Sequence, residues 1–369
     1  MNVAITMSIC YQGRVMKQPS NVTRSRGDLP APAADRAFDQ LDAAAQRAHL
    51  DDVARRALAR WNLPADSALR LLSLSENATY RVDAPTLEAP AALRVHRTGY
   101  HSRAGIETEL AWMAALREEA GIDTPQAIAG ADGGFVQCVD TPALAESRFV
   151  DLFHFIPGAE PDENALAGPF EQLGRLTARL HTHAAHWQRP DFFERLVWDF
   201  DGCLGTRSHL GHWQQAPGLD AADRAVLEAT AACIRERLAG YGTAPQRFGL
   251  IHADLRLANL LVDGDTTHII DFDDCGLGWH LYDLATALSF IETRDDIDAL
   301  VAAWLRGYRE IGTLDAADEA EIPTFIMMRR MTLLGWIATH PSADMAIEQG
   351  ESFARDTVAL AERYRARFA

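Results

Sequence analysis

Hydrophobic positions in the first half of the chain follow two spacings. Apolar residues that recur every three or four positions predict helices, and short apolar or β-branched runs between turn-forming residues predict strands. Gly121, Pro125 and Pro157 punctuate these runs. The pattern predicts helices over residues 37–61 and 107–119 and strands over residues 69–74, 79–82, 91–96, 135–139 and 148–155. We therefore expect a first half in which strands surround a few helices.

The second half of the chain is predominantly helical in its pattern. A short β-rich island interrupts it, with strands expected over residues 250–251, 260–262 and 268–272 and a hairpin turn at Asp263-Gly264-Asp265. Helices are predicted over residues 171–186, over residues 221–238 and from Leu281 onward. The overall fold class is therefore α+β.

Proline, glycine, serine and basic residues dominate the beginning of the chain, where no periodic apolar pattern exists. We expect residues 1–35 to form a flexible leader. The remaining chain is predicted to divide into a β-rich domain over residues 36–156 and a helical domain over residues 157–369.

Composition narrows the class of protein. The 369 residues are 48% hydrophobic and 24% charged, which is ordinary for globular domains. A formal net charge of -17 argues against a nucleic-acid partner. No run of 18 apolar residues predicts a membrane span, and the five cysteines lack paired spacing. We expect a cytoplasmic protein without a disulfide scaffold; its oligomeric state is not predicted.

One segment carries a pattern typical of phosphoryl transfer. His252, Asp254 and Asn259 stand in the order His-x-Asp, four residues, Asn, which is the spacing of a kinase catalytic loop. About a dozen residues later, Asp271 follows two isoleucines, as the metal-binding aspartate of kinases follows a strand. This combination is far more specific than the loop motif alone.

The chemistry assigns a role to each of these residues. Phosphoryl transfer depends mostly on positioning and on neutralising phosphate charge. Asp254 is predicted to be the catalytic base that accepts the proton of the acceptor hydroxyl. Mg²⁺ prefers hard oxygen ligands, so Asn259 and Asp271 are predicted to hold the metal on the phosphates of ATP. The expected hairpin would bring both ligands beside Asp254.

Residues 250–288 resemble the aminoglycoside phosphotransferase/choline kinase family, and within it the group of homoserine kinase type II, hydroxylysine kinase and stress response kinase. The resemblance implies a protein-kinase-like fold with a small β-rich N-lobe that binds nucleotide and a larger helical C-lobe. It also implies structural roles for His252 and for Asp283, which would brace the catalytic loop.

The resemblance gives candidate nucleotide contacts in the first half. Ser75 and Asn77 stand where the family has its phosphate loop, although an ordinary hairpin turn is an alternative. The strand that ends near Phe155 resembles the hinge strand whose backbone meets adenine, so Phe153 and Phe155 are candidate contacts.

Arg94 stands where the family has its phosphate-binding lysine, and Lys17 is the only lysine of the chain. Arginine also neutralises phosphate, but it is planar and bulkier than lysine. The resemblance makes Glu109 the expected ion-pair partner of Arg94, with Glu107 as the second choice. On this interpretation, lysine at position 94 should retain or raise activity.

Charged residues beside the motif bear on the acceptor. Asp273 and Asp274 could form a second metal site, anchor a cationic substrate or lie in a solvated turn, and Arg256 could meet a substrate carboxylate. His183 and His186 share a helix face, but no further ligand completes a zinc site, so packing or surface roles are expected.

Three functions remain open from the sequence. The first is transfer of the γ-phosphate of ATP to a hydroxyl of a small molecule, expected to be a cationic amine, amino alcohol or hydroxy amino acid. The second is a Ser/Thr protein kinase of the stress response kinase type. The third is a non-catalytic nucleotide-binding regulator, which Arg94 alone favours.

Overall fold

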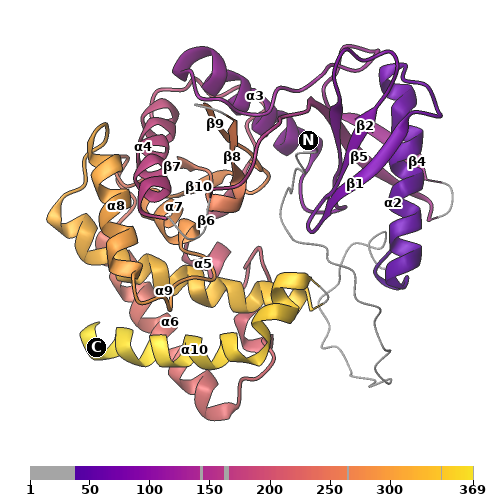
Figure 1. The fold of residues 1–369 in the computed structure, drawn as a ribbon. Coiled ribbons are helices and arrows are strands. Elements are labelled where there is room, and N and C mark those ends of the chain that lie inside the picture. Colours follow the sequence, from indigo (N-terminus) through magenta and orange to yellow (C-terminus); the bar gives the residue numbers. More distant parts are fainter. Residues whose placement is uncertain (1–37, 142–143, 162–165, 264–265, 342, 369) are drawn as a thin grey trace. The chain divides into compact units, whose positions relative to one another are not determined.

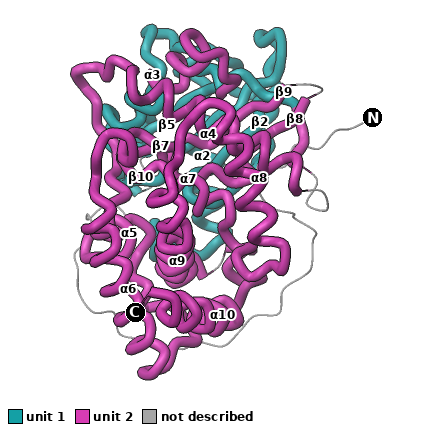
Figure 2. Tube along the Cα trace, turned by 90° about the vertical axis from the view of Figure 1, so that its left-hand side faces the viewer, with its two compact units in different colours: residues 1–110, 125–157 teal, residues 111–124, 158–369 magenta. Residues whose placement is uncertain are grey.

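A computed structural model describes residues 38–141, 144–161, 166–263, 266–341 and 343–368 (Figure 1). The chain forms two compact units, one from residues up to 110 with residues 125–157, the other from residues 111–124 and 158–369 (Figure 2). The predicted leader and the tip of the predicted turn, residues 264–265, lie outside the described residues. No helix of the described residues is long and apolar enough to cross a membrane.

The first unit is built on one antiparallel sheet. Its strand order is β1-β2-β3-β5-β4, and each predicted strand of this half is present. Helix α3 begins in this unit four residues before the predicted start, and a 3-10 turn ends the first predicted helix. The elements are α2 (Ala43–Ala57), η1 (Leu58–Trp61), β1 (Ala68–Leu74), β2 (Ala78–Asp83), β3 (Ala91–Val95), α3 (Arg103–Ala120), β4 (Gln137–Thr141) and β5 (Glu146–His154).

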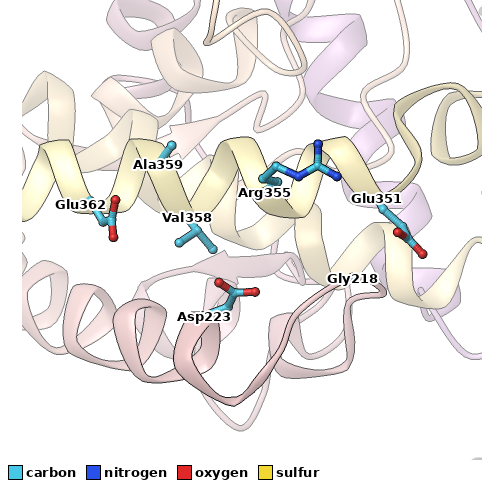
Figure 3. Close-up of a pocket in the computed structure, with 7 residues that line it drawn as sticks. All are labelled: Gly218, Asp223, Glu351, Arg355, Val358, Ala359 and Glu362. Atoms are coloured by element: carbon cyan, nitrogen blue, oxygen red, sulfur yellow. The ribbon is translucent and has the colours of Figure 1, made fainter.

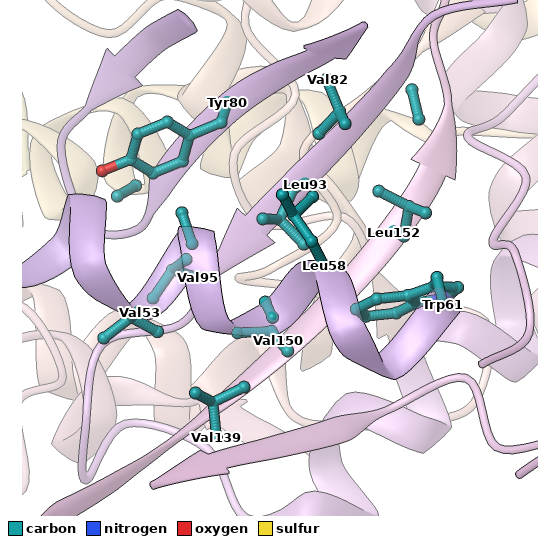
Figure 4. Packing of buried hydrophobic residues seen from close by; sticks show 14 of the residues in the cluster. Val53, Leu58, Trp61, Tyr80, Val82, Leu93, Val95, Val139, Val150 and Leu152 are labelled. Carbon is teal, nitrogen blue, oxygen red and sulfur yellow. The ribbon is translucent and has the colours of Figure 1, made fainter. Parts of the chain in front are cut away.

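Alternation along the strands sends apolar side chains to one face of this sheet, where they meet α2. Leu93 and Val95 of β3 lie in the same buried cluster as Val150 and Leu152 of β5 and Val53 of α2 (Figure 4). The intervening residues of β3 and β5 therefore point to the opposite face. That face carries the polar groups described below.

The second unit is mainly helical, as predicted. Its longest helices are α9 and α10, and Gly350 interrupts α10 with non-helical dihedral angles. The helices are α4 (Ala167–Ala184), α5 (Phe200–Cys203), α6 (Ala221–Tyr241), α7 (His280–Ala287), α8 (Ile297–Arg309), α9 (Ala316–Thr339) and α10 (Asp344–Phe368), with η2 (Trp213–Gln215) and η3 (Leu257–Asn259).

Two small sheets flank the segment that carries the predicted catalytic loop. Strands β8 (Leu260–Asp263) and β9 (Thr266–Ile269) form the predicted hairpin, while β7 (Phe248–Ile251) joins β6 (Leu196–Trp198) and β10 (Gly276–Trp279) in the order β6-β10-β7. Strands β6 and β10 were not predicted. Glycine is required in β10, because a Cβ at Gly276 would lie 2.5 Å from the backbone carbonyl oxygen of Leu196.

Candidate active site

The predicted catalytic loop is held by side chains of α7. Asp283 accepts hydrogen bonds from the backbone N–H groups of His252 (3.1 Å) and Ala253 (2.7 Å), and Thr286 Oγ1 accepts one from Leu255 (3.1 Å). Ala253 has φ of 67°, a left-handed conformation that costs energy for a residue with a Cβ. The buried Asp283 therefore maintains an unfavourable backbone conformation immediately before Asp254.

His252 is a buried structural residue of this loop. Burial lowers the pKa of its imidazole, despite the nearby charges of Asp283 and Asp254. The ring is therefore neutral, and its Nε2 donates to the carbonyl of Ile270 at 3.1 Å. Its Nδ1 consequently accepts from the backbone N–H of Asp254 at 3.3 Å.

Both carboxylate oxygens of Asp254 contact cationic or donor groups. Oδ1 accepts from Nη2 of Arg329 at 2.6 Å, while Oδ2 lies 3.3 Å from Nε of Arg256 and accepts from the amide of Asn259 at 3.1 Å. Burial alone would raise the pKa of Asp254, but the charges of Arg256 and Arg329 hold it below its ordinary value. Asp254 is therefore an oriented anion.

The hairpin brings the two predicted metal ligands to one end. Leu260 pairs with Ile269, and the N–H of Ile270 donates to the carbonyl of Asn259 at 2.9 Å. Asn259 donates its amide nitrogen to the main-chain carbonyl of Asp254 at 2.8 Å, so its Oδ1 is the atom suited to a cation. Asp271 is exposed and has φ of 61°. An amide oxygen and an exposed carboxylate fit a hard divalent cation.

The segment after Asp271 is fixed through its carbonyl groups. The guanidinium of Arg195 donates to the carbonyls of Asp273 and Cys275, and the indole of Trp198 donates to that of Asp274 at 2.7 Å. The Asp273 side chain is buried, whereas that of Asp274 is partly exposed. Asp274 is thus not in a fully solvated turn, and the two carboxylates have different access to solvent.

In the first unit, the predicted ion pair of Arg94 is present. Its Nη1 donates to Glu109 at 2.8 Å, and both groups are buried. Glu107 instead pairs with Arg103. The guanidinium also donates from Nε and Nη2 to Asp151, at 3.1 and 2.7 Å, and lies 5.1 Å from the centre of the Phe153 ring.

The remaining candidate nucleotide contacts occupy defined positions. Ser75 and Asn77 lie in the β1–β2 turn, and the Asn77 side chain accepts from the backbone N–H of Arg97 at 3.1 Å. The backbone N–H of Phe155 donates to the carbonyl of Pro90 at 3.2 Å, so this donor is used within the unit. The Phe153 ring centre lies 5.1 Å from the guanidinium of Arg94, and the Phe155 ring centre lies 4.7 Å from that of Arg81.

His181 and His183 of α4, and His186 in the turn that follows the helix, have partners within the second unit. His181 contacts Asp283 and the hydroxyl of Tyr308, each at 3.0 Å, and His183 contacts Glu119 at 3.1 Å. Nδ1 of His186 lies 3.0 Å from the carbonyl of Thr182. Among the described residues, no group of three His, Cys, Asp or Glu side chains is arranged to hold a metal ion.

A pocket of about 310 Å³ lies between α6 and α10 (Figure 3). Asp223, Glu351 and Glu362 line it together with Arg355. Asp223 already serves the capping box that begins α6. None of the predicted site residues lines this pocket, so it is separate from the catalytic loop in sequence and in composition.

Sequence reasoning missed Arg329 and Asp151. Arg329 and Arg330 interrupt the methionine-rich run of α9, and Asp151 stands between apolar residues of β5. A charge inside an apolar run is costly unless it has a partner, and that was the available signal. The partners themselves depend on tertiary structure, because Asp254 precedes Arg329 by 75 residues and Arg94 precedes Asp151 by 57.

Residues 67–320 match the phosphotransferase enzyme family over most of the chain. The chain belongs to this family. The predicted resemblance and the kinase-like α+β fold are thereby confirmed. This phosphotransferase has in Asp254, Asn259 and Asp271 the residue types and loop geometry that such chemistry uses.

Three known kinases are similar to this chain in structure or in sequence. A microcompartment-associated aminopropanol kinase is 43% identical, with a TM-score of 0.79 over 86% of this chain and 98% of that one. An amicoumacin kinase solved with AMP-PNP and Ca²⁺ has a TM-score of 0.69 over 88% of this chain and 96% of that one, at 20% identity. The homoserine kinase of Neisseria meningitidis serogroup B is 33% identical over 160 residues, 41% of this chain and 47% of that protein.

ATP and a divalent metal ion are typical of the family, as predicted for this chain. The donor set at Asn259 and Asp271 fits the metal, and the cationic Arg94 fits a phosphate. When bound, the metal supplies neutralisation of phosphate charge.

Proposed function

We propose that this phosphotransferase transfers the γ-phosphate of ATP to the hydroxyl of a small amino alcohol of the aminopropanol type, in the cytoplasm. The observation that carries the proposal is the anionic, doubly anchored Asp254 beside Asn259, in a chain 43% identical to an aminopropanol kinase. Residues 36–156 would form the nucleotide-binding lobe and residues 157–369 the catalytic lobe.

Asp254 would orient the acceptor hydroxyl and accept its proton as the oxygen–phosphorus bond forms. The bond between the γ-phosphorus and the bridging oxygen breaks, and ADP leaves with that oxygen. Because the pKa of Asp254 is held low, the carboxylate contributes more by orientation than by basicity. This suits a loose transition state, in which little proton transfer is needed early.

Other residues would hold the charged parts of the reactants. Asn259 and Asp271 would bind Mg²⁺, and Arg94, held by Glu109, would contact the phosphates. Ser75 and Asn77 would lie near the phosphates, and Phe153 with Phe155 near the base.

The electrostatics around Asp254 constrain where an ammonium group can bind. Arg256 and Arg329 both contact this carboxylate, so an ammonium drawn to Asp254 would meet two guanidinium groups. We therefore assign the ammonium to the partly exposed Asp274 rather than the buried Asp273, and leave Arg256 able to meet the carboxylate of a hydroxy amino acid.

An ADP-release assay tests the function. The acceptors are 1-amino-2-propanol, ethanolamine, homoserine, 1,2-propanediol as the neutral isostere, and a serine-rich peptide. A kcat/KM for the amino alcohol at least about tenfold above that for the diol is expected from a charge contact in a partly closed site. Equal kcat/KM values for the amino alcohol and the diol would contradict the proposal that the acceptor is cationic. Turnover with the peptide alone would identify a protein kinase, and ATP binding without turnover of any acceptor would identify a regulator.

A further inference from the structure

Two buried ion-pair groups on β5 of the first unit each join a carboxylate to one arginine and one histidine, but they lie in different surroundings. Asp151 contacts Arg94 and His96, and Glu146 contacts Arg148 and His49. All of these side chains are buried. Only the first group includes the residue that stands at the position of the family lysine.

The strand register fixes the partnership of Asp151 and Arg94. In the antiparallel pairing of β3 with β5, Arg94 lies directly opposite Asp151. Both residues point to the face of the sheet away from α2, since their neighbours Leu93 and Leu152 enter the apolar cluster. Directly opposed residues are nearer to each other than diagonal neighbours are, and opposite charges at such a pair stabilise a sheet.

The geometry of the contacts is specific to a guanidinium. Arg94 uses Nε and Nη2 for the two oxygens of Asp151 and Nη1 for Glu109, so one rigid fork spans two carboxylates. A lysine carries its three donors on a single nitrogen, so it cannot reproduce the two-nitrogen contact with Asp151 together with the separate contact with Glu109.

We propose that Asp151 is a positioning residue that orients Arg94 toward the phosphates of ATP and makes arginine, not lysine, the required cation of this site. The inference rests on the proposed function in one respect, the placement of Arg94 at the phosphates. It reverses the expectation that lysine at position 94 retains activity. A lysine there would serve Glu109 and leave the carboxylate of Asp151 buried beside His96 alone.

The charge of Asp151 supports this role. Complete burial favours the neutral carboxyl, yet Arg94 and His96 hold the pKa of Asp151 below its ordinary value. The carboxylate is thus ionised, and an ionised carboxylate in this position requires a strong partner. Removing the charge of Asp151 should therefore relieve the requirement for arginine.

The test is calorimetric titration of the full-length protein with ATP and Mg²⁺, without an acceptor. The variants are Arg94→Lys, Asp151→Asn, the double variant Arg94→Lys/Asp151→Asn, Arg94→Ala and the control Glu146→Gln. Glu146→Gln makes the same change, carboxylate to amide, in the matched group on the same strand. Thermal unfolding of each variant reports its stability separately.

Arg94→Lys is expected to weaken ATP binding at least about tenfold, and the double variant to recover at least about threefold of that loss. Asp151→Asn is expected to weaken ATP binding, whereas Glu146→Gln should lower only the unfolding temperature. If the Asp151→Asn variant does not fold, the ATP affinities of Arg94→Lys and of the double variant still test the inference when they are compared.

Three results would overturn the inference, and they fall into two distinguishable groups. A double variant that binds ATP no better than Arg94→Lys, or a Glu146→Gln variant as impaired as Asp151→Asn, removes the role of Asp151 and leaves the proposed function intact. Wild-type affinity in Arg94→Ala removes the placement of Arg94 at the phosphates and the inference with it.

Discussion

Replacing Arg329 with lysine isolates the contact that orients Asp254. The guanidinium donates from Nε to Ser289 Oγ at 2.9 Å and from Nη2 to Asp254 at 2.6 Å, and only 4% of the side chain is exposed. A lysine has a single nitrogen in place of these two donor atoms and cannot reproduce both contacts in the same geometry. The Arg329→Lys variant therefore keeps the positive charge of α9 and loses the fixed direction of the contact.

The magnitude follows from the kind of bond that is lost. A hydrogen bond to a charged group contributes about 1.5–3 kcal/mol. If the bond serves to align Asp254 in the transition state, its loss lowers kcat by about 10- to 150-fold. The KM for ATP should change little, because Arg329 contacts Asp254 and Ser289 rather than Asn259 or Asp271.

Arg330 supplies a matched control on the same helix. It is buried beside Arg329, donating to Glu292 at 2.7 Å and to Thr357 at 2.8 Å, on the side of α10. The Arg330→Lys variant should lose a similar amount of stability and keep kcat within about twofold. Steady-state kinetics with the best amino alcohol, and thermal unfolding, measure both. Equal kcat losses in the two variants, or wild-type kcat in Arg329→Lys, would refute the reasoning.

Three further predictions concern chemistry, metal and pH. Asp254→Asn keeps size and fold but should lower kcat about 10²–10⁴-fold, measured by ADP release; a near-normal kcat contradicts its role. Asp271→Ala should weaken ATP binding far more with Mg²⁺ than without it, measured calorimetrically, and equal losses would indicate a folding role. Burial lowers the pKa of His280 to about 3, so stability is present above the unfolded pKa and lost as pH falls toward 3. His280→Gln should remove up to about 2 kcal/mol of the stability difference between pH 7 and pH 5, measured by denaturant unfolding, and an unchanged difference excludes this group.

Periodicity predicted most of the fold because burial in each element follows a simple repeat. All strands of the first unit and the β8–β9 hairpin were found within a few residues of their predicted bounds. The strands β6 and β10 were not predicted, because three or four residues are too few to show a period. The two glycines of β10 can be interpreted only when the structure shows that Leu196 and Ile251 pack against them.

The candidate site was predictable where its residues are close in sequence. Asp254, Asn259 and Asp271 fall in one segment, and the hairpin that joins them has its own local signals. Arg329 and Asp151 come from distant segments, and nothing local tells a helix arginine that pairs with Asp254 from one that pairs with Glu292. Such partners require knowledge of how α9 packs and of the register between β3 and β5.

The pairing of Arg94 with Asp151 also bears on how the sheet of the first unit selects its own alignment during folding. Slipping β5 by one residue against β3 would turn Asp151 toward α2, among Val53 and Leu93, and turn Leu152 outward. An ionised carboxylate without a partner in that cluster would cost several kcal/mol, whereas an apolar residue at position 151 would impose little penalty. The same carboxylate therefore excludes the misaligned sheet, and an Asp151→Leu chain would fold with a less strictly specified strand register.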